Sequence, residues 1–287
     1  MAPTAVLLLS CPDRTGVVAA VADFVWRHGG NIVDAEQHTD EVDGEFFQRV
    51  EFELDGFAFD RADLSKAFWP IAERFDMSVR VHFSDERPRL AILASKAPHC
   101  LEDLLGRWRA GELPADVALV ASNHPDHRAL AEFSGVEYLH VPVDGEGPQA
   151  AAAQEAAMLA ALADAQVERV VLARYMRILS PAFVGQYPNR IINIHHSFLP
   201  AFVGAQPYRQ AHERGVKVIG ATAHFVTADL DQGPIIDQDV ARVSHRDDVA
   251  ELARKGRDLE VAVLARAVRA DLEHRVLPFG NRTVVFH

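Results

Sequence analysis

Residues 190–205 read RIINIHHSFLPAFVGA. The first six form a mostly apolar run of strand length, and such runs are typical of strands buried on both faces of a parallel sheet. Residues two apart in a strand face the same side, so Asn193 and His195 project together, away from Ile192 and Ile194. A buried amide and imidazole are costly unless they are hydrogen-bonded. The stretch therefore predicts a central strand that carries either a satisfied buried polar pair or a functional site.

Earlier runs have the same character: LAILAS at 90–95, VALVAS at 117–122 and RVVLAR at 169–174. Helical stretches separate them, notably the alanine-rich 149–165, and the periodic stretch 248–275 indicates a C-terminal helix. Alternating strands and helices predict a doubly wound, mostly parallel α/β domain over residues 89–287. Open sheets of this class bind ligands outside the carboxyl ends of their strands, which is where Asn193 and His195 lie.

The first part of the chain follows a different order. A strand is predicted at 4–10, and a helix starts at Val17 and ends at Gly29-Gly30. The later elements are a strand pair joined by an Asp-Gly turn, a helix and a last strand, at 31–42, 45–54, 61–75 and 77–83. This βαββαβ order predicts a small antiparallel sheet with two helices on one face. The polar, proline-containing stretch SDERPR at 84–89 separates the two patterns, so the predicted domains are 1–83 and 89–287, with a linker at 84–88.

Composition narrows the class of protein. The chain has 287 residues and a formal net charge of −12, without a dense Lys/Arg run, which disfavours a nucleic-acid partner. Cys11 and Cys100 provide no disulfide framework and favour a reducing compartment. The N-terminus lacks a basic region before its apolar run, and no apolar stretch reaches the roughly 20 residues of a membrane span. We expect a cytoplasmic protein that neither binds nucleic acid nor enters a membrane.

A second informative stretch is GATAHFVTADLDQGPIIDQDV at 220–240. It predicts two strands around a polar loop, 227–233, that holds Asp229 and Asp231. An acidic loop residue is ordinarily only solvated. Asp231 therefore indicates a site only in combination with Asn193 and His195.

A metal site is the main competing interpretation of these polar residues, because imidazole and carboxylate groups are common ligands. Two of the histidines, His195 and His196, are adjacent in the predicted strand and should point to opposite faces. His224 and Asp231 add no compact metal-binding spacing to them. The sequence therefore predicts that no metal is bound.

The two stretches together resemble the folate-dependent formyltransferase family. The family pattern N-x-H-x-S-x-L-P-x-x-x-G is matched by Asn193, His195, Ser197, Leu199, Pro200 and Gly204. The pattern H-x-V-x-x-x-x-D-x-G-P-I-I is matched by His224, Val226, Asp231, Gly233, Pro234, Ile235 and Ile236. The resemblance implies that Asn193, His195 and Asp231 are catalytic and that His224 supports them. It also implies a folate pocket built from Leu172, Arg177, Ile178, Leu179, Val226, Thr227, Ala228 and Leu230. For the apolar members of this set, plain core packing is the alternative.

The chemistry of formyl transfer suits the implied catalytic residues. Attack on a formamide carbon produces an oxyanion, and a side-chain N–H from Asn193 can stabilise it by roughly 3–4 kcal/mol. A carboxylate at Asp231 raises the protonated fraction of a nearby His195 and can accept a proton from the nucleophile. The leaving N10 must regain a proton, from His195 or from water.

The stretch SCPDRTGVVAAVADFVWRHGGNI, 10–32, resembles the opening of an ACT domain, a module that often binds amino acids. The resemblance implies regulation by methionine or glycine, with Asp13, Gly16 and Asn31 as candidate contacts. ACT domains commonly pair at their sheet edges, so we expect a homo-oligomer, either a dimer or a tetramer. A domain that serves assembly alone is the alternative.

The formyl acceptor distinguishes the families. In ribotide formyltransferases a glycine-rich loop after the first strand binds phosphate, but here LASKAPHCLEDLL at 93–105 has no glycine. An ACT-like domain ahead of a formyltransferase-like domain resembles the formyltetrahydrofolate deformylases, and His196 fits their pattern. The resemblance implies hydrolysis of 10-formyltetrahydrofolate to formate and tetrahydrofolate, a hydrolase reaction at a linear amide C–N bond that needs no cofactor. In that family the reaction supplies formate for purine synthesis and balances one-carbon pools. The open alternatives are an amine-nucleotide formyltransferase and a non-catalytic amino-acid sensor.

Overall fold

The computed structural model describes residues 3–143, 145, 147–200 and 207–287. Gly204 of the first motif lies outside the described residues. The contacts divide the chain into two units. The first comprises Met1–Glu86, Glu273–Leu277 and Val284–His287, and the second comprises Arg87–Leu272 and Pro278–Thr283.

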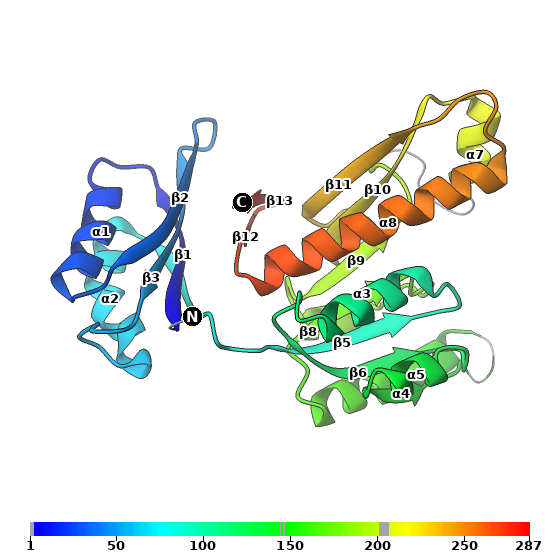
Figure 1. Cartoon of the computed structure of the whole chain (residues 1–287), viewed down its shortest axis with the longest axis horizontal. Coiled ribbons are helices and arrows are strands. Elements are labelled where there is room, and N and C mark those ends of the chain that lie inside the picture. The colour runs from blue at the N-terminus through cyan, green and yellow to red at the C-terminus, as the bar shows by residue number, and fades with distance from the viewer. Residues whose placement is uncertain (1–2, 144, 146, 201–206) are drawn as a thin grey trace. The chain divides into compact units, whose positions relative to one another are not determined.

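The first unit is built on an antiparallel sheet of order β2-β3-β1-β4 (Figure 1). Its elements are β1 (Thr4–Pro12), α1 (Val17–Arg27), β2 (Ile32–Asp40), β3 (Glu45–Glu53), α2 (Arg61–Phe75) and β4 (Ser78–Phe83). Apolar side chains at helical spacing, such as Phe24 and Phe68, pack on alternate strand residues such as Leu7 and Val50. The predicted βαββαβ arrangement is confirmed.

The last residues of the chain group with this first unit. The backbone N–H of His287 donates to the carboxylate of Glu36 at 2.9 and 3.1 Å, and the ring of His274 stacks on His82. The sequence pattern assigned all residues after 88 to the second domain. Nothing in the pattern of a long helix followed by short strands indicates which sheet those strands reach.

The second unit contains a sheet of order β11-β10-β9-β8-β5-β6-β7. The strands from β9 to β7 run parallel, whereas β10 is antiparallel to both β9 and β11. The strands are β5 (Arg89–Ala94), β6 (Asp116–Ser122), β7 (Glu137–His140), β8 (Arg169–Ala173), β9 (Ile191–His195), β10 (Val218–Phe225) and β11 (Ile235–Arg242). The predicted doubly wound, mostly parallel domain is confirmed.

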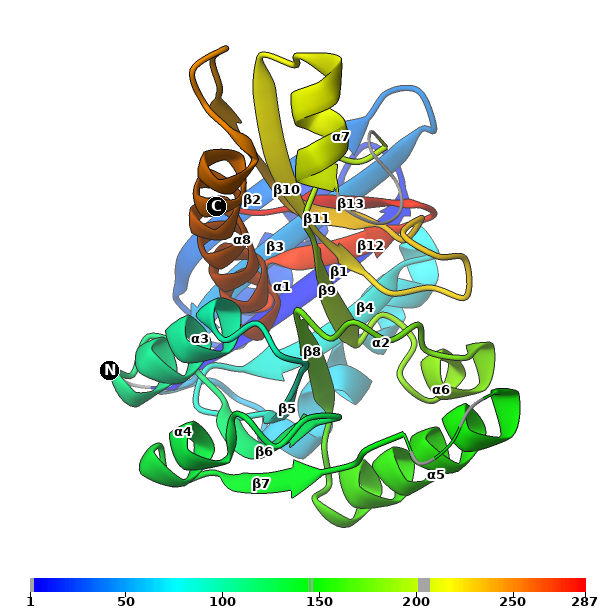
Figure 2. The ribbon, with the colours of Figure 1, turned by 90° about the vertical axis from the view of Figure 1, so that its right-hand side faces the viewer.

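Helices cover both faces of this sheet, with α3 and α8 on one face and α5 and α6 on the other (Figure 2). The helices are α3 (His99–Arg109), α4 (Arg128–Phe133), α5 (Pro148–Asp164), α6 (Pro181–Gln186), α7 (Pro207–Arg214) and α8 (Val249–Leu272). The strands β12 (Val276–Phe279) and β13 (Arg282–Val285) pair with each other. Helix α8 ends before residue 275, the predicted limit, because His274 takes the left-handed conformation with φ 55°. No helix within the described ranges is both long enough and apolar enough to cross a membrane.

Candidate active site

The site begins where the sheet changes direction, at the carboxyl end of β9. The antiparallel register places His224 of β10 opposite Asn193 and Thr222 opposite His195. Residues paired in this way share one face of the sheet. The strand alternation predicted from the sequence and the β9–β10 pairing therefore bring Asn193, His195 and His224 together.

His224 orients the amide of Asn193. The Nδ1 atom of His224 lies 2.8 Å from the carbonyl oxygen of Phe225, which can only accept, so Nδ1 carries the hydrogen. Nε2 then accepts from Nδ2 of Asn193 at 3.2 Å. Burial lowers the pKa of His224, which keeps its ring neutral and able to accept. An amide has two N–H groups, so the second one can donate to a ligand.

His195 and Asp231 form the second pair of the site. Nδ1 of His195 lies 3.3 Å from Oδ2 of Asp231, and the hydrogen bond with His195 holds the pKa of Asp231 below its ordinary value. The other ring nitrogen of His195, Nε2, is buried and has no hydrogen-bond partner among the described residues. A buried polar atom without a partner is costly to folding. Such an atom fits a group that meets its partner only when substrate is present.

The loop after β10 places Asp231 beside this histidine. Asp231 has φ 55°, a left-handed conformation that is uncommon for residues other than glycine. Two residues later, a Cβ atom on Gly233 would lie 1.8 Å from the carbonyl oxygen of Phe225. The loop therefore closes tightly onto the end of β10 only because residue 233 is glycine. This contact gives a physical reason for the D-x-G part of the motif.

A cavity of about 410 Å³ opens beside these residues. Its wall includes Asn193, His195, His224 and Asp231. The eight residues predicted to form the folate pocket all line it: Leu172, Arg177, Ile178, Leu179, Val226, Thr227, Ala228 and Leu230. Ile178 is 73% exposed and Leu230 53%, so apolar side chains reach solvent here. The size and mixed lining suit a small organic ligand.

Comparison with known proteins identifies the family. A model described as formyl transferase matches residues 88–268, and one described as ACT domain matches residues 5–61. A formyltetrahydrofolate deformylase of Synechocystis is 56% identical over 283 residues, covering 99% of this chain and 98% of that protein. The chain belongs to the formyltetrahydrofolate deformylase family.

Solved structures agree with this membership. A deformylase from Pseudomonas syringae superposes with a TM-score of 0.96 at 49% identity, covering 100% of this chain and 95% of that one. A glycinamide ribonucleotide transformylase from Symbiobacterium toebii reaches a TM-score of 0.67 at 36% identity. That protein covers 72% of this chain, with 97% of its own length matched. The deformylase likeness thus extends over both units.

Several residues that line the cavity were not predicted. They are Arg174, Tyr175, Met176, Ile194 and His196. His196 does not point away from His195 as predicted, because β9 ends at His195 and strand alternation stops there, and both side chains line the cavity. The two rings lie with centroids 5.3 Å apart. Burial, together with Arg174, lowers the pKa of His196 to about 4, so this ring is neutral at pH 7.

The candidate effector residues do not meet within one chain. The backbone N–H of Asp13 donates to Gly44, at one end of β3, and Gly16 follows in the same turn. Asn31 accepts from the backbone N–H of Glu53, at the opposite end of β3, and its side chain donates to the Glu53 carboxylate. The three residues therefore do not form one site within a single chain, and the effector site stays a prediction. Sequence proximity to the ACT motif carries no information on which end of the sheet a residue reaches.

Proposed function

We propose that the protein hydrolyses 10-formyltetrahydrofolate to formate and tetrahydrofolate, with water as the acceptor. The observation that carries the proposal is the buried, unpartnered Nε2 of His195 beside the amide of Asn193, in the wall of the cavity. An imidazole nitrogen and an amide N–H are the two groups that hydrolysis of a formamide requires, one for the proton and one for the oxyanion.

The cavity holds the folate. The flat faces of the folate ring system fit among Leu172, Ile178 and Leu230, which line the cavity together with Val226 and Ala228. Covering the exposed side chains of Ile178 and Leu230 removes apolar surface from water and favours binding. The formyl group then reaches the polar end of the cavity, where β9 and the 226–231 loop meet.

Asn193 stabilises the charge that develops on the formyl oxygen. Its amide is fixed by His224, which is itself fixed by the carbonyl of Phe225. A donor held in advance loses little energy to reorganisation when the oxyanion forms. This arrangement assigns His224 the role of a positioning residue.

His195 moves the proton. Asp231 accepts a hydrogen bond from Nδ1, so Nε2 is free to take a proton from the attacking water. The water oxygen bonds to the formyl carbon, the C–N10 bond breaks, and N10 receives the proton that His195 holds. The ionised Asp231 stabilises the imidazolium during this sequence, because opposite charges at this distance attract. Water and the folate balance the reaction, and no cofactor or metal is needed.

The ACT-like unit gives the enzyme a means of regulation. We place a small amino acid such as methionine or glycine on a homo-oligomer, at the seam where two sheets pair, since one chain alone separates Asp13 and Gly16 from Asn31. Strand β2 lies at an edge of its sheet and exposes most of its side chains, which suits such pairing. Cys11 and Cys100 are buried free thiols, which fits a reducing cytoplasm.

Formate release from 10-formyltetrahydrofolate in buffer alone tests the proposed activity. Purified protein should release formate without any amine acceptor, at a rate proportional to enzyme. Release that appears only after an amine nucleotide is added would contradict hydrolysis and favour a formyltransferase. Folate binding without release under either condition would favour a sensor.

A further inference from the structure

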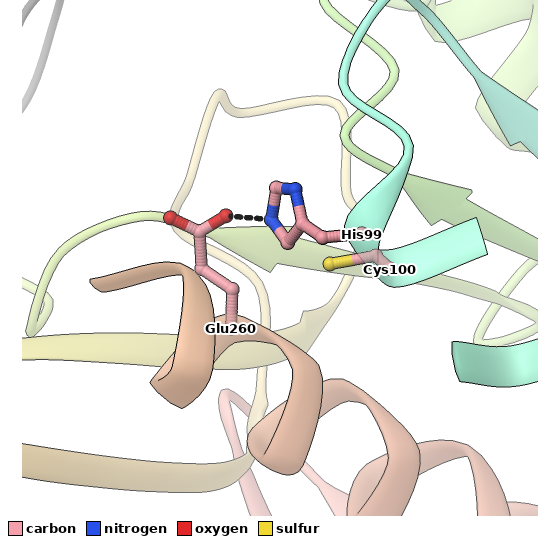
Figure 3. A group of neighbouring side chains, drawn as sticks. All are labelled: His99, Cys100 and Glu260. Carbon is pink, nitrogen blue, oxygen red and sulfur yellow. Dashed lines mark hydrogen bonds and ion pairs between the residues drawn. The ribbon is translucent and has the colours of Figure 1, made fainter. Parts of the chain in front are cut away.

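A buried polar cluster adjoins the catalytic cavity. Glu260 of α8 is 1% exposed, and its Oε2 lies 2.8 Å from Nε2 of His99, the first residue of α3. Its Oε1 accepts from the hydroxyl of Tyr208 on α7 at 2.5 Å, and Nε of Arg174 lies 3.3 Å from Oε2. Figure 3 shows the His99 ring pointing at this carboxylate, with the Cys100 sulfur beside it.

The cluster could be mistaken for a metal site. The ligand atoms of His99, Cys100 and Glu260 lie within 4.8 Å of one another. However, both oxygens of Glu260 already have protein partners, and the Arg174 cation would repel a metal ion. Burial raises the pKa of the Cys100 thiol, which keeps it protonated and a poor ligand. The Glu260 carboxylate is therefore already occupied by protein groups, while the buried Nδ1 of His99 has no hydrogen-bond partner among the described residues.

The carboxylate is ionised within this cluster. Burial alone would raise the pKa of Glu260, but the hydrogen bond from His99, the charge of Arg174 and the hydroxyl of Tyr208 together lower it. A buried charge with this set of partners is held rigidly, because losing any one of them leaves it poorly compensated. The cluster is therefore a fixed part of the fold.

The cluster stands directly behind one wall of the cavity. Arg174 and His196 line the cavity, and Arg174 is the residue paired with Glu260. The ring of Tyr208 faces His196, with centroids 6.2 Å apart. Glu260 thus contacts Arg174, and Tyr208 contacts His196, on the side away from the cavity. These contacts leave the two side chains little space to move out of the cavity wall.

Helix α8 makes room for this packing. Gly256 lies one turn before Glu260, on the same helix face, and a Cβ atom there would lie 2.0 Å from the hydroxyl oxygen of Tyr208. Glycine inside a helix costs about 1 kcal/mol relative to alanine. The close approach of the tyrosine to the helix offsets this cost with a buried hydrogen bond to Glu260.

We propose that His99, Tyr208 and Glu260 close the acceptor side of the cavity and so restrict the acceptor to water; this inference rests on the proposed function. With the folate placed among the apolar lining residues, we place the acceptor at the polar part of the wall, where Arg174 lines the cavity and the His196 ring lies 5.3 Å from that of His195. Side chains fixed by the cluster fill that side. A water molecule needs little space, whereas an amine with a substituent needs Arg174 and His196 to move back into the volume that Tyr208 and His99 occupy.

The same catalytic residues would serve an amine if space were made. The amine nitrogen would bond to the formyl carbon, the C–N10 bond would break, and N10 would receive the proton that the amine loses. His99→Ala combined with Tyr208→Ala removes the two rings and leaves Asn193, His195 and Asp231 unchanged. Tyr187→Ala is the matched control, because Tyr187 is a buried tyrosine of the same unit that packs in the core near Phe183, whereas Tyr208 packs against His196.

The test follows isotopically labelled formyl groups in the presence of hydroxylamine or glycinamide. Wild type and Tyr187→Ala should give formate with almost no N-formylglycinamide. The double variant should raise the ratio of N-formylglycinamide to formate by at least ~10-fold, the scale of discrimination by pocket shape. An unchanged ratio in a double variant that still releases formate would overturn the inference. Wild type that releases no formate without an amine would instead overturn the proposed function.

A second measurement does not depend on the variant folding. With wild type, hydroxylamine should be formylated at least ~10-fold more readily than the bulkier glycinamide, after correction for their intrinsic reactivity with free 10-formyltetrahydrofolate. Equal use of the two amines by wild type would show that this side of the cavity is open. The closed-wall inference would then be wrong.

Discussion

At the scale of single residues, proton transfer and oxyanion stabilisation are assigned to two different pairs of side chains. His195 with Asp231 handles the proton, and Asn193 with His224 handles the charge on oxygen. Each working atom is thus fixed by a partner that does not touch the reacting carbon. Changes at the partners should therefore lower turnover through misplacement, whereas changes at the working residues remove the chemistry itself.

Asp231→Asn tests the proton half of the site. The variant keeps the side-chain shape but loses the charge that stabilises the His195 imidazolium, so we expect at least a ~100-fold lower kcat. Asn193→Ala and His195→Ala should each lower kcat by at least the same factor. Asp229→Asn is the matched control, since Asp229 is an exposed acid of the same loop. Loss of similar size in both aspartate variants would argue against a specific role for Asp231.

His196 gives a prediction about acid stability. This histidine titrates near 6.5 when the chain is unfolded and near pH 4 when it is folded, because burial and Arg174 oppose its charge. Between these pH values the unfolded state binds the extra proton, so the free energy of unfolding falls as the pH drops from about 6.5 to 4. His196→Asn lacks this contribution and should lose less stability on acidification, measured by urea unfolding at pH 7 and pH 4.5. His245→Asn, at an exposed histidine, should behave as wild type; equal acid losses in all three proteins would contradict the burial of a neutral His196.

At the scale of elements, the β9–β10 pair and the loop that follows it position the chemistry. The antiparallel pairing sets Asn193 against His224, and the loop returns so closely that Gly233 touches the end of β10. The site is thus built on sheet backbone on one side and on a tight loop on the other. Its precision depends on that loop keeping its path.

Gly233→Ala should move this loop. The added Cβ would meet the carbonyl oxygen of Phe225, so Asp231 must shift away from His195. A displacement of about 1 Å can cost on the order of 100-fold in rate, and we expect a loss of that size with a lower Tm. Gly106→Ala on α3 is the control, because a Cβ there meets nothing within 4 Å. A Gly233 variant with normal kcat and Tm would contradict the described loop packing.

The sequence predicts best what depends on local periodicity. The strand alternation that pairs Asn193 with His195, and the helix over 61–75, follow from residue spacing and match the structure. The direction of the His196 side chain does not follow from this spacing, because it depends on where β9 ends. The Glu260 cluster could not be predicted from the sequence either. It joins α3, α7, α8 and the end of β8, and contacts between distant segments leave no periodic signal in the sequence.

At the scale of the whole molecule, two units divide the work. All residues proposed for chemistry lie in the second unit, between Leu172 and Asp231 in sequence, while the ACT match covers residues 5–61. An effector bound to the first unit can alter the rate only if it binds two states of the enzyme with different affinity. The coupling free energy sets how large the effect can be.

Methionine or glycine should change the rate of the intact enzyme. Typical coupling of about 1–3 kcal/mol corresponds to a 5–150-fold change in apparent affinity, which a titration of formate release resolves. Asn31→Ala should abolish the response and leave the basal rate unchanged, because Asn31 directly precedes β2 and bonds to Glu53 in the first unit, outside the catalytic unit. If neither amino acid alters rate or Tm in wild type, the ACT-like unit serves assembly alone.

Oxygen tracing tests the central claim, that water is the acceptor, most directly. A single turnover of 10-formyltetrahydrofolate in H₂¹⁸O, without any amine, should give formate that carries one ¹⁸O atom. The same yield of labelled formate should persist when glycinamide is present. Formate that lacks the label, or a formyl group that leaves the folate only with an amine present, would contradict hydrolysis by this site.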